Sequence, residues 1–487
     1  MRVGDAGVSK LDRWGIPLAA MAILTLAAGC SSASGGRTPS PSAKTSASAS
    51  AGGSATACVA TWQLSAALTP SGASADSTEL AGVAAVSSTD VWALGSSATS
   101  ATAAPTTLTE HWNGSAWSIA KSPDASNAAA LGGDQLTAVA AVSQADIWAV
   151  GYIGTPTVSR SAQGGGQETA VQTLTEHWNG TAWLVVNAPD VAARDGVEPW
   201  DVLTSIDAIS TDDVWAAGVT EWPLTYGGGS FVAAQPLVEH WNGTYWAIVS
   251  VPDPEPAPPD WALAPGGTPP AAGATIGSVA LLGVASGSAN DVWLVGGYES
   301  DMGVQTYAPS PWETLTEHWN GTSWSAVQAP DATLSEPLSG GSSSADDLLT
   351  SASEASGGTL WAVGGALPGS ALTLQLGLAF GTSSFTGWHL VPSLAVTTVI
   401  DRTGYPSSGS GATSFAPGTS ALAGVVTVNA TDAWAVGAVI LHWDGVSWQP
   451  MFTVKGEPFD YLSGVATTGS GGLWAVGGTS IVHATCA

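Results

Sequence analysis

Basic residues are scarce in this chain of 487 residues, which has 10 Lys and Arg against 38 Asp and Glu and a formal net charge of −28. Such an acidic protein repels phosphate backbones, which excludes nucleic acid as a partner. Cysteine is scarce too: 3 residues are too few for a small disulfide scaffold or a cysteine-rich zinc domain. Hydrophobic residues make up 45% of the chain, which excludes a wholly disordered protein. Length alone suggests about three domains, unless the chain is built from repeats.

The N-terminal stretch has the pattern of a secretory signal. Arg2, Lys10 and Arg13 precede an apolar run over 16–28. As a helix this run would be about 20 Å long, too short for a bilayer core of roughly 30 Å. It ends in Leu-Ala-Ala-Gly followed by Cys30, which resembles the lipobox of bacterial lipoproteins, where the cysteine is lipidated before cleavage. The alternative is a plain secretory signal in which the cysteine has no role.

A low-complexity segment follows, built almost entirely of Ser, Ala, Gly, Thr and Pro. It has no apolar periodicity and cannot bury a core, so it is predicted to be a flexible tether. The predicted organisation is a lipoprotein signal peptide over 1–29, a tether over 30–57 that begins with lipidated Cys30, and a folded domain over 58–487. These features predict an extracytoplasmic protein that a lipid anchors to the cell membrane.

The folded domain consists of one repeated unit. A short strand ending in Trp-Ala-x-Gly, or a close variant, occurs seven times, at Trp92, Trp148, Trp215, Trp293, Trp361, Trp434 and Trp474. A Glu-His-Trp-Asn-Gly segment follows in four copies, at Glu110, Glu176, Glu239 and Glu317, with a variant at Leu441 and a decayed copy over 379–388. With a strand of small residues in front and another strand after Asn-Gly, each unit holds four strands.

This pattern predicts an all-β fold, a seven-bladed β-propeller of four-stranded antiparallel blades. The last unit lacks its fourth strand, and a matching strand stands at the N-terminus of the domain, with Trp62 in the place of Trp117. The N-terminal strand is therefore predicted to close the ring. Cys58 and Cys486 lie where that closing hairpin would turn, and an oxidising exterior permits a disulfide bond between them. Two free thiols are the alternative.

The Asn-Gly-x-x-Trp hairpins, with Asp-Gly-x-x-Trp at 444–448, resemble the Asp-box repeats of secreted bacterial propellers, including sialidase-like and photosystem-assembly-factor-like proteins. In those repeats a strand that ends in Gly precedes an Asp-Gly-x-x-Trp hairpin. The resemblance covers 58–487. It implies the propeller fold but no activity, because propellers host many unrelated functions. Sialidases of similar fold use an arginine triad, and Arg160, Arg194 and Arg402 do not stand at matching strand positions.

Repetition also decides how the polar residues are interpreted. A catalytic residue is needed once, so a structural role between strands is predicted for the repeated histidines, which are His111, His177, His240, His318, His442 and His483. The repeated aspartates (Asp90, Asp146, Asp213, Asp291 and Asp432) are predicted to cap backbone N–H groups at tight turns, with calcium binding as the alternative. Asn-Gly predicts two-residue type I′ turns. The sequence has no zinc-ligand spacing or phosphate-binding loop, so neither a metal nor a cofactor is predicted.

All long inserts fall in two kinds of connection, from the second to the third strand of a blade and from the fourth strand to the next blade. Both lie on one face of a propeller, the decorated face; the opposite face is the plain face. The tryptophans outside the repeat lie in these inserts. With two acidic neighbours they form the predicted ligand-binding set of Trp200, Trp222, Trp261, Trp312, Glu221 and Asp301. Aromatic rings beside carboxylates suit sugar stacking or protein capture. The alternative is that these rings only pin the loops to the ring of blades.

The predicted function is that of a surface-anchored binding or scaffolding module for envelope glycan or a partner protein. The alternative is a carbohydrate-active hydrolase or lyase on the decorated face, and the resemblance adds an assembly factor for envelope proteins. An enzyme of the hydrolase class would need a convergent pair of non-repeated carboxylates.

Overall fold

The computed structural model describes residues 60–155, 170–193, 197–226, 229–252, 275–303, 312–331, 346–355, 358–367, 370–378, 385–391, 422–451, 454–455, 460–468 and 472–486. Apart from the 3-10 helix η2 (Ala75–Ser77) and helix α1 (Ala128–Leu131), the regular elements in these ranges are β-strands. The strands belong to six four-stranded sheets and one five-stranded sheet.

The six four-stranded sheets, here blades 1 to 6, are antiparallel and pair their strands in chain order. Blade 1 holds β2 (Thr78–Ser87), β3 (Asp90–Ser97), β4 (Thr106–Trp112) and β5 (Trp117–Ala120); blade 2 holds β6 (Asp134–Ser143), β7 (Asp146–Ile153), β8 (Gln172–Trp178) and β9 (Trp183–Val186). Blade 3 holds β10 (Trp200–Ser210), β11 (Asp213–Tyr226), β12 (Gly229–Trp241) and β13 (Trp246–Ile248); blade 4 holds β14 (Thr275–Ser288), β15 (Asp291–Gly303), β16 (Glu313–Trp319) and β17 (Trp324–Val327). Blade 5 holds β18 (Asp346–Ala355), β19 (Thr359–Leu367), β20 (Ser370–Leu378) and β21 (Phe385–Leu390); blade 6 holds β22 (Leu422–Asn429), β23 (Asp432–Gly437), β24 (Ile440–Trp443) and β25 (Trp448–Pro450).

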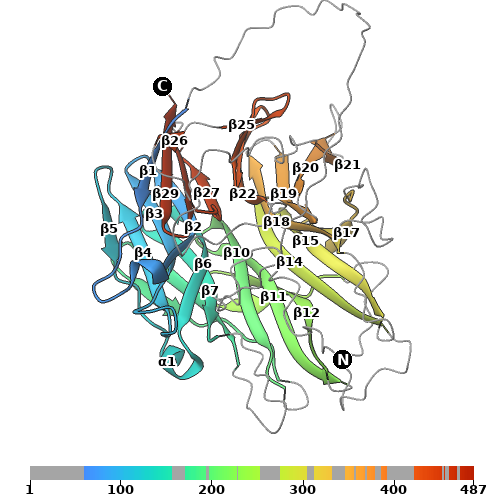
Figure 1. The fold of residues 1–487 in the computed structure, drawn as a ribbon. Coiled ribbons are helices and arrows are strands. Elements are labelled where there is room, and N and C mark those ends of the chain that lie inside the picture. Colours follow the sequence, from blue (N-terminus) through green and yellow to red (C-terminus); the bar gives the residue numbers. More distant parts are fainter. Residues whose placement is uncertain are drawn as a thin grey trace, which may run out of the picture.

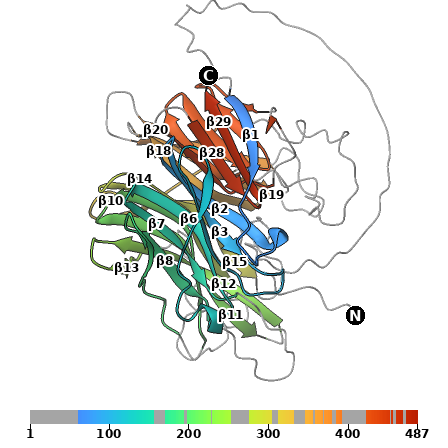
Figure 2. The ribbon, with the colours of Figure 1, turned by 90° about the vertical axis from the view of Figure 1, so that its left-hand side faces the viewer.

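The five-stranded sheet joins the two ends of the domain. Its order is β26 (Val454–Lys455), β1 (Ala60–Ala66), β29 (Ser480–Cys486), β28 (Gly472–Gly477) and β27 (Gly464–Thr467). The pairing of β1 with β29 is antiparallel and places Trp62 opposite Ala484, and Figures 1 and 2 show the two strands side by side. This sheet differs from the predicted four-stranded unit, because β26 adds a parallel strand at its outer edge.

The first strands of blades 1 to 6, together with β27 of the five-stranded sheet, surround a common axis. Each contacts the next in the order β2, β6, β10, β14, β18, β22 and β27, and β27 contacts β2 again. The sheets therefore radiate from this axis, as Figures 1 and 2 show, and the chain is an all-β propeller of four-stranded antiparallel blades. Apolar clusters rich in tryptophan fill the space between neighbouring blades, for example around Trp92 and Trp183 and around Trp148 and Trp246.

A β-bulge at one position of the first strands brings hydroxyl groups to the neighbouring blade. The pairing of β6 with β7 skips Thr137, whose Oγ1 donates to the carbonyl oxygen of Leu203 in blade 3 at 2.6 Å. Thr204, skipped in the same way, donates to Leu282 at 3.1 Å. Further bonds of this kind run from Thr350 to Leu422 and from Ser463 to Ala81. These hydroxyls join one blade to the next near the axis.

The Asn-Gly hairpins are wider than the predicted two-residue turns. Trp112 pairs with Trp117, so four residues lie between the paired positions. The Asn113 side chain explains this, because its Oδ1 accepts the backbone N–H groups of Ser115 at 3.0 Å and Ala116 at 3.1 Å and so organises a longer loop. Gly114 has a φ of 91°, which favours glycine there.

One predicted loop is instead β-structure. The insert over 219–235 extends the hairpin of β11 and β12, in which pairing continues from Val219 opposite Pro236 to Tyr226 opposite Gly229. Its β-branched and aromatic residues favour strands. The decorated face therefore carries a strand extension at this blade.

We predict that loss of the Thr137 hydroxyl weakens the boundary between blades 2 and 3. The substitution Thr137→Val keeps the shape but leaves the Leu203 carbonyl without its donor, which should cost about 1–3 kcal/mol of unfolding free energy. Thr137→Ser keeps the hydroxyl and is the control. Denaturant unfolding of the three proteins checks this, and equal stability of the Val and Ser variants would contradict it.

Candidate functional site

The repeated histidines form a structural unit with the repeated aspartates and tryptophans. In blade 1, His111 Nε2 lies 2.9 Å from Asp90 Oδ1 and must be the donor, because a carboxylate oxygen only accepts. The imidazole stacks on Trp92, with ring centroids 4.4 Å apart. Equivalent His–Asp pairs, between 2.8 and 3.0 Å long, are His177–Asp146, His240–Asp213, His318–Asp291 and His442–Asp432. The repetition supports the predicted structural role.

The aspartates were predicted to cap backbone N–H groups at turns, and this prediction was wrong, because their hydrogen bonds go to side chains. The Asp90 carboxylate accepts from the side chains of His111 and Trp92 rather than capping a turn. In the five-stranded sheet this aspartate is missing, because Gly472 occupies the equivalent strand start. His483 still stacks on Trp474, but burial lowers the pKa of this imidazole.

Three of the predicted ligand-binding tryptophans are buried. Trp200 is 3% exposed, and Trp222 and Trp312 are each 2% exposed. Trp200 and Trp312 belong to one apolar cluster with Tyr152, Val202 and Leu348, at the decorated ends of blades 2 to 5. Glu221 is also buried, at 2% exposed, and lies opposite Trp200 in the pairing of β10 with β11.

These rings are therefore not open to a ligand on the surface, and the alternative role of pinning the inserts to the blades fits their burial. The sequence could not decide this, because a tryptophan in an insert has the same appearance whether it is exposed or joins the core. Trp261 lies outside the described residues. Asp301 lies on β15, and its side chain is outside the described part of the structure.

The predicted lipidation site and the predicted disulfide also stay untested. Cys30 and Cys58 lie outside the described residues, and only the backbone of Cys486 is described. The register of β1 and β29 places Cys486 opposite Ala60, two residues after Cys58.

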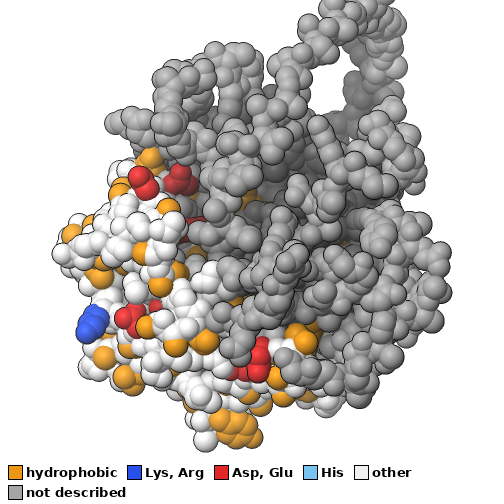
Figure 3. Space-filling model, turned by 60° about the horizontal axis from the view of Figure 1, so that its bottom comes forward, with side chains coloured by type: hydrophobic (Ala, Val, Ile, Leu, Met, Phe, Trp, Pro, Cys, Tyr) orange, Lys and Arg blue, Asp and Glu red, His pale blue; other side chains and the backbone are white. Residues whose placement is uncertain are grey.

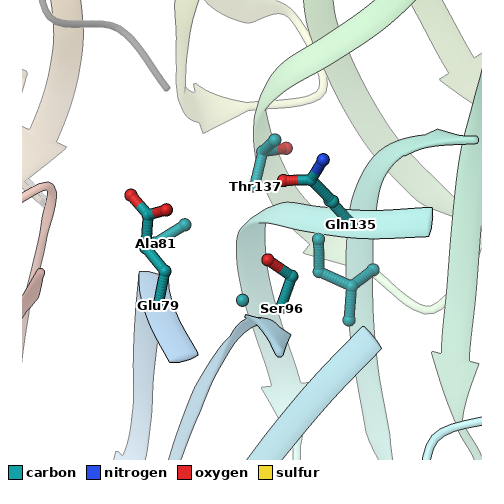
Figure 4. Close-up of a pocket in the computed structure, with 7 residues that line it drawn as sticks. Glu79, Ala81, Ser96, Gln135 and Thr137 are labelled. Atoms are coloured by element: carbon teal, nitrogen blue, oxygen red, sulfur yellow. The ribbon is translucent and has the colours of Figure 1, made fainter. Parts of the chain in front are cut away.

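A small pocket opens between blades 1 and 2 at the decorated ends of their first strands. Glu79, Ala81, Gly95, Ser96, Gln135, Leu136 and Thr137 line it. Figure 4 shows Glu79 and Ser96 on strands of blade 1 and Gln135 and Thr137 on the neighbouring strand of blade 2. Sequence analysis missed this pocket. The position of Glu79 holds Gln135 in blade 2 and Val202 in blade 3, so its variation from blade to blade was the available signal.

Glu79 is the charged group of this pocket. Its side chain is exposed to solvent, yet protein atoms surround the carboxyl on most sides. Burial and, to a smaller extent, the carboxylate of Asp460 raise its pKa above the ordinary value. Asp460 itself is held in place, because its Oδ2 accepts the backbone N–H and the hydroxyl of Thr479, each at 2.8 Å. A positively charged ligand group would relieve the repulsion between the two acids.

Cations are scarce throughout the described surface. Lys121, which is exposed, is the one lysine or arginine whose side chain the structure describes. Figure 3 shows a face on which the described side chains are mostly hydrophobic or uncharged, with scattered acidic groups. Within the described ranges, no group of three or more His, Cys, Asp or Glu side chains is arranged to hold a metal ion. In the same ranges no helix is long and apolar enough to cross a membrane.

A second pair of non-repeated carboxylates lies at the plain ends of the first strands. The Asp207 carboxylate accepts the backbone N–H and hydroxyl of Ser286 at 2.7 and 2.6 Å, which fixes its position. Glu354 lies near it, and burial, then Asp291 and Asp207, raise the pKa of Glu354 to about 7. These acids are on the face opposite to the predicted site.

No family model and no curated protein matches this chain. Solved structures similar to it include one of YCF48 bound to D1 peptide, at 11% identity, covering 87% of this chain and 94% of that chain with a TM-score of 0.45. YCF48 from Cyanidioschyzon merolae is 10% identical, over 87% of this chain and 98% of that chain, with a TM-score of 0.43. A streptogramin B lyase is 10% identical, over 88% of this chain and 98% of that chain, with a TM-score of 0.42. At this distance the likenesses carry no argument about function.

We predict that Trp222→Ala and Trp312→Ala lower stability, because each removes a buried ring. The expected cost is about 3–5 kcal/mol of unfolding free energy. The control is Tyr245→Ala, since Tyr245 is 58% exposed at a hairpin tip and should change stability little. Thermal and denaturant unfolding check this. Tryptophan variants as stable as the control would mean that these rings are dispensable to the core.

Proposed function

We propose that the protein is a binding or scaffolding module that captures a partner at the pocket around Glu79. The partner is an envelope protein that presents a lysine or arginine side chain. The observation that carries the proposal is an exposed carboxylate with a raised pKa that lines the pocket, feels the charge of Asp460 and is paired with no described cation. Such a group gains most from an incoming positive charge.

The neighbouring groups suit this role. Ser96 and Gln135 line the same pocket and offer a hydroxyl and an amide group to the backbone of a bound segment, and Thr137, whose hydroxyl donates to Leu203, completes the wall. All of them stand on first or second strands, so the rigid ring positions them. The net charge of −28 would speed the approach of a basic partner.

Two further parts of the proposal concern how the module is closed and held. We infer that the five-stranded sheet serves as a seventh blade and that the N-terminal strand β1 closes the ring. The support is the antiparallel pairing of β1 with β29, and the bond from Ser463 to Ala81 across the boundary with blade 1. We also infer a lipid anchor at Cys30, followed by the tether, which would place the pocket outside the membrane.

The second candidate function is a carbohydrate-active hydrolase or lyase on the decorated face. The pair of Glu79 and Asp460 favours it, because a carboxyl with a raised pKa beside a second acid can serve as a general acid. The hydrogen bonds from Thr479 fix the position of the second carboxyl group, that of Asp460.

We predict that Glu79→Gln weakens binding of lysine-containing peptides about tenfold to a hundredfold, the loss expected for a central charged contact. The probes are immobilised peptides that differ only in having Lys, Arg or the uncharged norleucine at one position. The matched control is Asp76→Asn, which removes the same charge from an exposed residue. Binding should also weaken as salt rises.

Three outcomes would decide between the functions. Equal binding by the Glu79→Gln and Asp76→Asn variants would remove the pocket from the mechanism. Peptide binding that ignores the charged position would contradict cation capture. Cleavage of a glycan that Glu79→Gln abolishes, without peptide binding, would favour the enzyme.

We predict that the mature protein begins at Cys30 with a diacylglyceryl group on its thiol. Mass spectrometry of the N-terminal peptide from the membrane fraction checks this. The variant Cys30→Ala should lose the modification and leave the membrane fraction. Cleavage at another residue, with an unmodified secreted product, would contradict the anchor.

A further inference from the structure

The boundary between blades 2 and 3 holds three acidic side chains from three elements. Asp190 belongs to the exit segment Ala188–Val191, which follows β9 and begins a connection on the decorated face. Asp201 stands on β10 and Glu239 on β12, both in blade 3. Asp190 and Asp201 are the charged groups that act on Glu239.

Two of these acids hold the exit segment in place. Asp190 Oδ1 accepts the backbone N–H of Thr173 at 2.7 Å, which ties the segment to its own blade. Asp201 Oδ2 accepts the backbone N–H of Val191 at 2.7 Å, which ties it to the next blade. Ala188 and Val191 also pack against the apolar cluster between the blades.

Glu239 is different, because it is 0% exposed and neither carboxyl oxygen has a hydrogen-bond partner within the described residues. The adjacent His240 points to the other face of the strand and pairs with Asp213, so it does not neutralise this carboxyl. A buried ionised carboxylate without partners is costly. Burial first, then the charges of Asp190 and Asp201, raise the pKa of Glu239 to about 9.

The preceding boundary shows what Glu239 lacks. In blade 2 the equivalent Glu176 accepts a hydrogen bond from the hydroxyl of Ser122, in the exit segment Ser122–Ala125. Asp124 and Asp134 complete a similar acidic set there, and the pKa of Glu176 is raised to about 8, chiefly by burial. The exit segment that faces Glu239 has Ala188 at the position of Ser122 and so offers no hydroxyl, while a proline follows in both segments, as Pro123 and Pro189.

A cation must neutralise this cluster if it is to remain buried at high pH. Neither boundary is arranged to hold a metal ion among the described residues, and Lys121, the one described basic side chain, is exposed. A proton is the cation that fits a closed space without further ligands. Its uptake makes Glu239 neutral and removes the repulsion from the other two acids.

We propose that the boundary between blades 2 and 3 is a proton-operated latch, in which protonated Glu239 keeps the exit segment Ala188–Val191 seated and its ionisation releases that segment. Because the exit segment leads onto the decorated face, the latch couples ambient pH to the order of that face. This device goes beyond the proposed binding function and does not depend on the pocket around Glu79.

The direction of the effect follows from proton linkage. An unfolded glutamate has its ordinary pKa of 4.5, so between that value and about 9 the seated state holds a proton that the released state gives up. The equilibrium constant for seating therefore falls about tenfold for each pH unit in this window. Below the window both states are protonated, and the latch is fully closed.

The test is hydrogen exchange of the peptide over 187–193 in the full-length protein, from about pH 5 to about pH 9, corrected for the intrinsic exchange rate. In the wild type, protection should fall with rising pH. Glu239→Gln should flatten this dependence, because the amide cannot ionise and only the contribution of Asp201, whose pKa burial raises to about 7, remains. A wild-type slope in that variant would overturn the proposal.

A second pair of variants keeps the test decisive if Glu239→Gln does not fold. Ala188→Ser supplies the donor that Ser122 supplies at the preceding boundary; because this donor stabilises the ionised carboxylate in the seated state, protection should persist to higher pH. Ser122→Ala is the matched change and should increase the loss of protection at high pH in the peptide over 122–127. If neither substitution shifts its own segment, the carboxyls do not control seating and the proposal fails.

Discussion

The close approach of the first strands around the axis is the constraint on which the other features depend. A Cβ atom on Gly82 would stand 3.1 Å from the Ala138 Cα of the next blade, and one on Gly283 would stand 2.9 Å from the Ser351 Cα. The neighbouring backbone cannot move away without opening the ring. Small residues are therefore required near the axis, and the hydroxyls of Thr137 and its equivalents supply the polar bonds between blades.

Since the axis admits no large side chains, the apolar core lies further out, between the outer strands. There a tryptophan from one blade meets tryptophans of the next, as where Trp92 contacts Trp183 edge to face with ring centroids 5.4 Å apart. The stacked histidine and its aspartate fix the orientation of the ring. The same contacts recur in neighbouring blades because each boundary poses the same packing problem.

This recurrence explains what the sequence could predict. The strand order, the blades and the structural role of His111 and its equivalents follow from repeated residues, whose meaning is confirmed by many copies. Trp200, Trp222 and Trp312 occur once each, so nothing in the sequence distinguished a ring that stacks on a ligand from one that enters the core. Glu79 was missed for a related reason. The position equivalent to Glu79 holds a different residue in blades 2 and 3. Whether the side chain there is exposed depends on how two neighbouring blades meet.

The shortage of basic residues connects the pocket and the latch. In most proteins an arginine or lysine would pair with a carboxyl held among other acids, and here the described side chains provide none for Glu79 or Glu239. The two glutamates differ in their exposure to solvent, and this gives them different roles. A ligand can bring a positive charge to exposed Glu79, whereas closed Glu239 can be neutralised only by a proton. The same deficit of cations thus favours partner capture at the surface and pH sensitivity between the blades.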